Sequence, residues 1–381
     1  MPLIQIEPDA QQKLEILQED ARDEQSAPPP MPRPELQHHL FDAQREHGGT
    51  TRLLKVLQTN ACRYSCPYCF TSCAVRRKRT TFKPDELATT FISLERQKRV
   101  EGLFLSSGIV PDADRAMEKM LATVERLRLR DRYRGYIHLK LIPGAAFEYI
   151  ERAVQLADRV SLNLEAPNPD RLGILAPEKE FEESMWQRLV WASQVMRQAW
   201  EWHLPAARSM TTQFVVGVAG EGDDELLRTV ERGTRELGLK RPYFSAFHPI
   251  SKTPFADKPA EDPVRAQRLY QASFLLRDYG FTVDELPFDA AGHLPRDRTP
   301  KQAWAERYLV GDPIELNRAP REVLLRVPGL GHRSVERLLQ ARRTTTLRDL
   351  SQLRYLGAQS AWAAPYVLLD GRRPLQQGRL F

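Results

Sequence analysis

The sequence lacks the features that membrane proteins and disulfide-rich proteins need. No apolar run approaches the roughly 20 residues of a membrane-spanning helix. Acidic residues occur near the N-terminus, where a secretory signal would carry a basic and then an apolar segment, so we expect a cytoplasmic protein with no membrane partner. Only four cysteines occur among 381 residues, which excludes a disulfide framework. With 41% hydrophobic and 28% charged residues, the composition is that of a folded globular protein.

Lysine is absent from residues 314–381, although this segment is the most basic part of the chain. It holds twelve Arg and five acidic residues, a balance of +7, whereas the whole chain has a net charge of +6. The first 313 residues are therefore close to neutral, at −1. We interpret the basic tail as a segment that contacts a polyanion, and we expect the rest of the chain to need no general attraction to polyanions.

Apolar segments typical of strands and helices alternate along the middle of the chain. Alternation of this kind predicts an α/β fold with a mostly parallel sheet, either a closed or partly closed barrel or an open doubly wound sheet. In both, the chemistry lies at the C-terminal ends of the strands. The predicted strands are residues 53–58, 102–106, 136–142, 159–164, 212–218 and 243–247, and the predicted helices are residues 84–99, 113–129, 146–157, 180–201, 223–237 and 263–279.

Changes in composition divide the chain into four parts. Residues 1–50 contain a short helix at 9–20 and a connector in which five Pro occur between positions 28 and 34. Residues 51–290 are expected to form the barrel, and residues 291–313, rich in polar residues, Gly and Pro, a linker. Residues 314–381 are expected to form a small all-α domain.

The four cysteines are confined to twelve residues, on a loop that follows the first predicted strand. Cys62, Cys66 and Cys69 are separated by three and two residues, so three thiolates can converge on one metal centre. Three thiolates on a four-iron cluster leave one iron open for a substrate or cofactor. Structural zinc or a ferredoxin-like centre are the alternatives, although the sequence has no second Cys/His group with zinc spacing. We expect Cys73 to be a free thiol.

The pattern Cys62-x-x-x-Cys66-x-x-Cys69, with the aromatic Tyr68 before its last cysteine, resembles the signature of radical S-adenosylmethionine (SAM) enzymes. The resemblance implies a partial (β/α)6 TIM-like barrel and a [4Fe-4S] cluster whose open iron is chelated by SAM. An electron from a reductant such as flavodoxin or ferredoxin cleaves SAM to methionine and a 5′-deoxyadenosyl radical, which abstracts hydrogen from the substrate.

Further residues match the cofactor-binding positions of this family. Small residues occupy the end of the second predicted strand, where the family usually carries Gly-Gly-Glu, and a Gly-containing segment ends the fifth strand. On the fourth strand, alternation places polar side chains on one face, either toward the barrel lumen or on a solvated edge. The candidate cofactor-binding residues are Tyr68, Ser106, Ser107, Gly108, Asn163, Glu165, Gly217 and Gly220. His138 and Lys140 share a face of the third strand, and Lys140 could bind an anion or extend to solvent.

The basic tail contains the run Val327-Pro-Gly-Leu-Gly331 between two short amphipathic segments. The two glycines permit a tight turn whose N–H groups form an anion nest above a helix N-terminus. This arrangement resembles a helix-hairpin-helix motif, which binds DNA phosphates, and a second, poorer copy follows at residues 347–367. A small helical protein-interaction module is the alternative. The candidate nucleic-acid-binding residues are Gly329, Gly331, Arg333, Arg337, Arg342 and Arg343.

The order of motifs carries the resemblance further. Segments such as GLFLSSG, GYIHLKLIPGA, LAPEK and TTQFVVG precede RVPGLGHRSVERLL, as in the radical SAM proteins assigned to DNA modification and repair. The resemblance implies a DNA substrate and a uracil-DNA-glycosylase-like partner. It does not identify the catalytic residues. Modification of RNA or of a protein, or a non-enzymatic DNA-binding scaffold with a structural metal cluster, are the alternatives.

Overall fold

The computed structural model describes residues 8–22, 40–44 and 50–374, and the predicted Pro-rich connector at residues 28–34 lies outside them. The chain divides into two compact units. The first comprises Met1–Glu221 and Arg232–Pro263, and the second comprises Gly222–Glu231 and Val264–Phe381. The second unit therefore includes residues that the sequence analysis assigned to the end of the barrel and to the linker.

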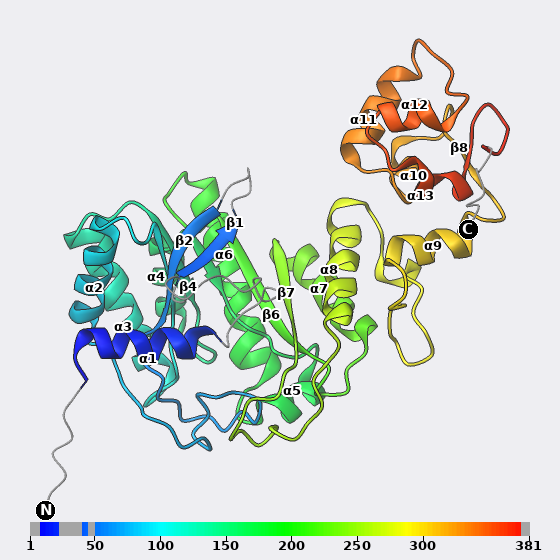
Figure 1. The fold of residues 1–381 in the computed structure, drawn as a ribbon. Helices are drawn as coiled ribbons and strands as arrows, with labels where there is room; N and C mark the ends of the chain where they lie inside the picture. The colour runs from blue at the N-terminus through cyan, green and yellow to red at the C-terminus, as the bar shows by residue number, and fades with distance from the viewer. Residues whose placement is uncertain (1–7, 23–39, 45–49, 375–381) are drawn as a thin grey trace, which may run out of the picture. The chain divides into compact units, whose positions relative to one another are not determined.

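A seven-stranded sheet forms the centre of the first unit (Figure 1). Strand β1 pairs antiparallel with β2, and β2 to β7 pair in parallel in sequence order. A doubly wound sheet would reverse its strand order, whereas this order is that of a barrel wound in one direction, so the predicted partial barrel is confirmed. The strands are β1 (Leu40–Gln44), β2 (Thr50–Leu57), β3 (Gly102–Ser106), β4 (Tyr136–Lys140), β5 (Arg159–Ser161), β6 (Ser209–Val216) and β7 (Arg241–Ala246).

Helices connect successive parallel strands and cover one face of the sheet (Figure 1). Their apolar stripes face inward; α4, for example, buries Ile150, Ala153, Val154 and Leu156. Helix α2 packs on α3, α3 on α4, and α4 on α6. The helices are α2 (Pro84–Arg96), α3 (Ala113–Glu125), α4 (Phe147–Leu156), α5 (Pro169–Leu175), α6 (Gln187–Glu201) and α7 (Asp223–Leu237), with π-helical turns at Arg126–Arg130 and Phe181–Trp186.

The structure differs from the sequence predictions at several elements. Strand β1 and helix α5 were not predicted from the sequence, and a single helix was predicted over residues 180–201, where a π-helical turn precedes α6. Strand β5 ends at Ser161, three residues before its predicted end. Beyond this point the Thr212 hydroxyl contributes to the pairing with β6: it donates to the Leu162 carbonyl at 2.8 Å and accepts from the Leu164 N–H at 3.2 Å.

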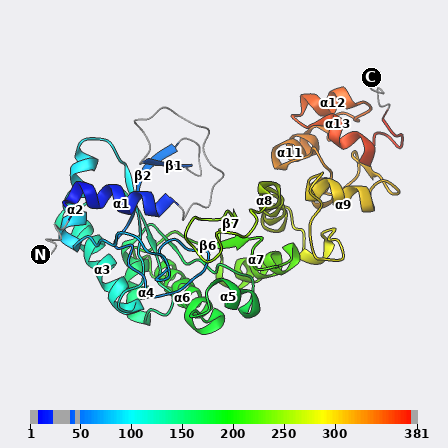
Figure 2. The ribbon, with the colours of Figure 1, turned by 60° about the horizontal axis from the view of Figure 1, so that its bottom comes forward.

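The predicted N-terminal helix is present as α1 (Ala10–Arg22) and belongs to the first unit. Figures 1 and 2 both show it lying beside β2, with which it is in contact. Leu17 and Ala21 are buried, and the Lys13 ammonium forms an ion pair with Glu86 of α2 at 2.9 Å. Helix α1 is therefore packed onto the barrel.

The second unit is mainly helical. Its predicted all-α character is wrong in one respect, because Ile314–Glu315 (β8) and Val367–Leu368 (β9) pair as a two-stranded parallel sheet. Arg265 and Asp223 form a buried ion pair at 2.7 Å in its core. Its helices, beside the first residues of α7, are α8 (Pro263–Asp278), α9 (Pro300–Tyr308), α10 (Arg321–Leu324), α11 (His332–Ala341), α12 (Leu350–Tyr355) and α13 (Ser360–Ala363), with 3-10 turns at Val283–Glu285 and Ala364–Tyr366.

Within the described ranges, none of the helices is long and apolar enough to cross a lipid bilayer.

Candidate active site

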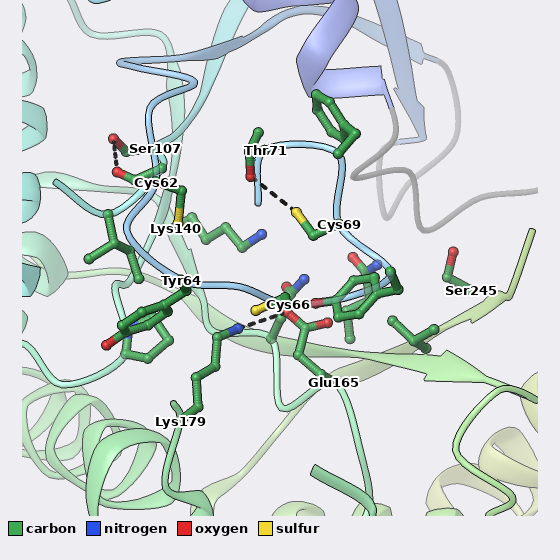
Figure 3. A pocket seen from close by; sticks show the side chains of 18 of the residues that line it. Cys62, Tyr64, Cys66, Cys69, Thr71, Ser107, Lys140, Glu165, Lys179 and Ser245 are labelled. Atoms are coloured by element: carbon green, nitrogen blue, oxygen red, sulfur yellow. Dashed lines mark hydrogen bonds and ion pairs between the residues drawn. The ribbon is translucent and has the colours of Figure 1, made fainter. Parts of the chain in front are cut away.

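The three cysteines of the motif meet at one pocket at the C-terminal end of the parallel sheet. Cys62, Cys66 and Cys69 follow β2 on a loop, and all three line the pocket, where Figure 3 shows their sulfur atoms facing its open centre. Cys73 is exposed and is not part of the lining. The structure thus separates three converging thiols from a fourth, as the sequence predicted.

A half-buried arginine holds the loop that carries these cysteines. The Arg79 guanidinium donates to the carbonyl oxygens of Thr71, Ser72 and Val75 at 2.6–2.8 Å. It also donates to the carbonyl of Asn60 at 2.5 Å, just before the first cysteine. One side chain therefore joins both ends of the cysteine loop, which has little regular secondary structure of its own.

Helix α1 supplies a second brace for the loop. The carboxylate of Asp20, only 1% exposed, accepts a hydrogen bond from the Asn60 amide at 2.6 Å and forms an ion pair with Arg77. Arg77 in turn stacks on the ring of Phe70, at 4.6 Å from the ring centroid, and Phe70 lines the pocket. We call Asp20, Asn60, Arg77 and Arg79 the loop clasp. The loop clasp was not predicted from the sequence, because Asp20 is at least 40 residues away from the other three along the chain.

The environment of the thiols fits an iron–sulfur cluster. Burial raises the pKa of Cys66 to about 12 and also raises the pKa of Cys69, so both thiols are protonated when no cation is near. Bound iron deprotonates coordinating thiols and compensates the buried charge. Within the described part of the chain, no group of three or more His, Cys, Asp or Glu side chains is arranged so that it could bind a single metal ion. The three thiols instead border a pocket.

A buried ion pair lies on the pocket wall with these thiols (Figure 3). The Lys179 ammonium is 3.4 Å from a carboxylate oxygen of Glu165, and both side chains are less than 10% exposed. Burial alone would lower the pKa of Lys179, but Glu165 and the neighbouring cysteines raise it, with a net upward shift. Glu165 was predicted from its strand, whereas Lys179, within the LAPEK motif, was given no role.

The Glu165 backbone explains why its carboxylate reaches this position. Its φ angle of +64° is uncommon for a residue with a side chain and bends the chain in the segment that follows β5. The N–H of Glu165 still donates to the Gln213 carbonyl at 2.9 Å. Burial strongly raises the pKa of Tyr68, and the Glu165 carboxylate, to which the hydroxyl is hydrogen-bonded, raises it further. Tyr68, Glu165 and Lys179 thus form one connected polar group.

Other predicted cofactor-binding residues divide into those in the pocket lining and those outside it. Ser107, Gly108 and Asn163 line the pocket, whereas Ser106 is buried and lies outside the lining. Gly108 is required sterically, because a Cβ at this position would lie 2.2 Å from the carbonyl oxygen of Ala61 in the cysteine loop.

Gly217 and Gly220 also lie outside the pocket lining. Both have positive φ angles, of 107° and 71°, which favour glycine. The Gly217 N–H donates to the buried carboxylate of Glu221 at 2.5 Å, and a Cβ on Gly217 would lie 2.4 Å from a Glu261 carboxylate oxygen. In the structure these glycines shape a turn around Glu221, a residue without an assigned role in the sequence analysis.

The two polar residues of the third predicted strand, now β4, have different environments. His138 is buried, shares a 2.8 Å hydrogen bond with the Ser161 hydroxyl, and packs edge-on against Phe104. Burial holds its pKa well below 6.5, so it is neutral at pH 7. Lys140 lines the pocket. Further polar side chains of the lining, which the sequence did not suggest, are Thr71, Gln213, Ser245 and His248.

In the second unit, the predicted nucleic-acid-binding arginines also differ in environment. Arg333, Arg337 and Arg343 are exposed. Arg342 is half-buried and donates to the carbonyl oxygens of Leu316 and Ala319 at 3.1 and 2.6 Å. Its guanidinium is therefore engaged in the fold.

A comparison with protein-family sequence models supports the radical SAM resemblance. A sequence model described as the Radical SAM superfamily matches residues 56–233. Solved structures similar to the chain include methylornithine synthase (PylB), with 16% identity and a TM-score of 0.44, covering 56% of this chain and 60% of that one. For HydG, a maturase of the [FeFe]-hydrogenase, the identity is 12%, the TM-score 0.43 and the coverage 58% and 48%.

A radical SAM methyltransferase from Sphaerobacter thermophilus has 14% identity and a TM-score of 0.45, with coverage of 63% of this chain and 75% of that one. The chain thus spans less than two thirds of the length of PylB and HydG. The comparison with curated protein sequences finds no match. Residues 56–233, which carry the three cysteines that line the pocket, therefore match the Radical SAM superfamily, whose members use a [4Fe-4S] cluster and SAM.

Proposed function

We propose that this protein is a radical SAM enzyme that modifies or repairs DNA, with Cys62, Cys66 and Cys69 holding the cluster and the second unit holding the nucleic acid. The bound cluster and SAM supply a 5′-deoxyadenosyl radical. The polar group of Tyr68, Glu165 and Lys179, together with Ser107, Gly108 and Asn163, orients SAM in the pocket. Because the pocket lies at the end of a barrel, a base has to leave the duplex to reach it, and single-stranded or flipped nucleotides are the substrates that fit.

The main support for a nucleic-acid target is a pair of hairpins in the second unit. The first joins α10 and α11 through Gly329, with φ +80°, and the second joins α12 and α13 through Gly357, with φ +84°. Both glycines occupy conformations that residues with a side chain rarely adopt. A turn of the same kind at Gly357 supports the proposal of a second copy, although its sequence is poorer.

The two hairpins contact each other reciprocally. The Gln359 N–H, which precedes α13, donates to the Gly329 carbonyl at 3.0 Å. In the other direction, a Cβ on Gly357 would lie 3.0 Å from the Arg337 guanidinium of α11. The hairpins therefore form one body that can present two anion-binding turns together.

Exposed arginines accompany both hairpins. Arg333, Arg337 and Arg343 belong to the first, and Arg348 and Arg354 to the second. If three of them neutralise phosphates, the logarithm of DNA affinity falls with the logarithm of salt concentration at a slope of about −2.7.

A paired substitution tests the DNA-binding role. In Arg333→Gln/Arg343→Gln, two exposed charges are removed, so the slope should become shallower by about 2, with weaker binding to all DNA sequences at low salt. Arg134→Gln/Arg208→Gln is the matched control, because both arginines are exposed in the first unit. An unchanged salt slope in the first variant would contradict the proposal.

The reaction itself is tested by mass spectrometry of nucleosides from DNA incubated with the reconstituted enzyme, SAM and reductant. A SAM-dependent product absent from Cys66→Ala supports DNA modification. A product in RNA or protein alone would select one of those substrates, and no SAM cleavage at all would favour a scaffold. The uracil-DNA-glycosylase-like partner stays a prediction.

A further inference from the structure

The cysteine loop is the most basic segment of the first unit. Residues 61–83 hold six basic residues and no acidic residue, although the first 313 residues together are close to neutral. The neutral average therefore conceals a local concentration of positive charge beside the cluster-binding thiols. The six are Arg63, Arg76, Arg77, Lys78, Arg79 and Lys83.

Internal contacts engage some of these charges. Arg77 pairs with Asp20, and Arg79 binds four backbone carbonyls. Arg63 is exposed but donates to the Pro111 carbonyl at 3.2 Å. Arg76 and Lys78 have exposed side chains that are not used by the loop clasp. These two residues, which we call the basic pair, flank the clasp residue Arg77.

The basic pair lies outside the pocket but close to the loop that forms it. Residues 76–79 are not part of the pocket lining. Arg77, between the pair, stacks on Phe70, which is in the lining and adjacent to Cys69. A substrate has to enter the pocket itself, because its atoms must reach the radical. An electron needs no such opening and can pass through the loop from a donor on its outer surface.

We infer that Arg76 and Lys78 form the docking surface for an acidic one-electron carrier protein. Radical SAM enzymes take their electron from a reductant such as flavodoxin or ferredoxin. Complementary charge raises the association rate of such carriers and sets their orientation. In the transfer, the reduced carrier loses one electron and the oxidised cluster gains it, with no atom exchanged. A nucleic acid is the competing occupant, but its phosphates already have a candidate site on the hairpins.

The test compares a charge-reversed enzyme, Arg76→Glu/Lys78→Glu, with wild type and with the exposed control pair Arg134→Glu/Arg208→Glu. The reconstituted full-length enzymes are titrated with an acidic flavodoxin, and Kd is measured at low and high salt. We expect Kd at low salt to rise about tenfold in the first variant only, and the difference to shrink as salt screens the charges.

A second measurement follows reduction of the cluster in the absence of DNA. For each enzyme, the rate with reduced flavodoxin is divided by the rate with reduced methyl viologen, a small cation that needs no protein docking surface. This ratio should fall about tenfold in the charge-reversed enzyme. If charge reversal damaged the cysteine loop, the rates with flavodoxin and with methyl viologen would both fall. In that case the milder variant Arg76→Gln/Lys78→Gln is measured, and the inference requires that it lowers the ratio of the two rates.

An unchanged Kd for flavodoxin in the charge-reversed enzyme would overturn the inference. Loss of DNA affinity with unchanged flavodoxin binding would also overturn it and would assign the pair to phosphate contacts. Because flavodoxin binding and cluster reduction are both measured without DNA, an unchanged Kd for flavodoxin leaves the proposed DNA function standing, and the absence of a DNA product leaves this inference standing.

Discussion

The loop clasp makes a specific prediction for Asp20, which lies 42 residues before the first cluster cysteine. Asp20→Ala removes a carboxylate that is 1% exposed, together with its hydrogen bond to Asn60 and its ion pair with Arg77. A lost buried hydrogen bond costs about 1–2 kcal/mol. Breaking a fully buried ion pair costs roughly 3–5 kcal/mol, but Arg77 is 25% exposed, so we take about 1–2 kcal/mol.

The two losses together lower the free energy of unfolding by about 3 kcal/mol in Asp20→Ala. Asp20→Asn keeps an acceptor for the Asn60 amide but removes the charge, so its loss should be about half as large. Denaturant unfolding of the unreconstituted protein measures both values. Because Arg77 also holds Phe70, the variants should bind less iron per chain and show a broadened electron paramagnetic resonance spectrum of the reduced cluster.

Lys13→Gln provides the matched control. Lys13 is also on α1, and its ion pair with Glu86 holds the helix on α2 without contacting the cysteine loop. This variant should lose about 1 kcal/mol and keep the iron content and spectrum of wild type. If Lys13→Gln lowered the iron content as much as Asp20→Asn, α1 would act only through general packing, and the clasp would be refuted.

Three further predictions concern other charged side chains. Lys179→Met leaves the Glu165 carboxylate buried without its cation, so unfolding should become easier by about 3 kcal/mol, whereas Glu165→Gln/Lys179→Met should recover most of this loss in the same denaturant assay. Burial lowers the pKa of Lys301 to about 7 in the folded protein, so above that pH the unfolded chain binds more protons than the folded one. The free energy of unfolding of wild type, relative to that of Lys301→Met, should therefore rise by about 2 kcal/mol from pH 7 to pH 9. Equal slopes would contradict that assignment. Arg342→Ala removes two hydrogen bonds to carbonyl oxygens and should lower the thermal unfolding temperature. Arg343→Ala should leave that temperature unchanged and weaken DNA binding. If instead Arg343→Ala lowered the unfolding temperature and Arg342→Ala weakened only DNA binding, the two assigned roles would be wrong.

The parts of the fold that depend on local patterns were predictable from the sequence. Strand β3 begins and ends at the predicted residues, because GLFLS is a short buried run. The three cysteines converge as their spacing indicated, since a loop of eight residues restricts where their sulfur atoms can lie. Such features are encoded within a few residues and need no knowledge of distant partners.

The parts that were not predictable depend on contacts between distant segments. Asp20 lies in the last turn of α1 and has the sequence signature of a solvated side chain, yet the fold buries it against the cysteine loop. Lys179 follows a proline in a short connection, and only the tertiary structure brings it to Glu165. Gly217 and Gly220 carry the correct residue type, but their backbone serves the turn around Glu221. A glycine indicates special backbone geometry without indicating what approaches it.

The braces on the cysteine loop bear on how the cluster is acquired. Burial keeps the free Cys66 and Cys69 thiols protonated, so these two side chains carry no charge that would hold the geometry of the loop before iron binds. Arg79, bound to four carbonyls, and Asp20, bound to Asn60 and Arg77, supply contacts that do not involve a cysteine. The conformational entropy of ordering the loop is therefore lost on folding rather than on binding iron. Amide hydrogen exchange of the unreconstituted protein should show residues 71–75 protected, and Asp20→Asn should remove part of this protection.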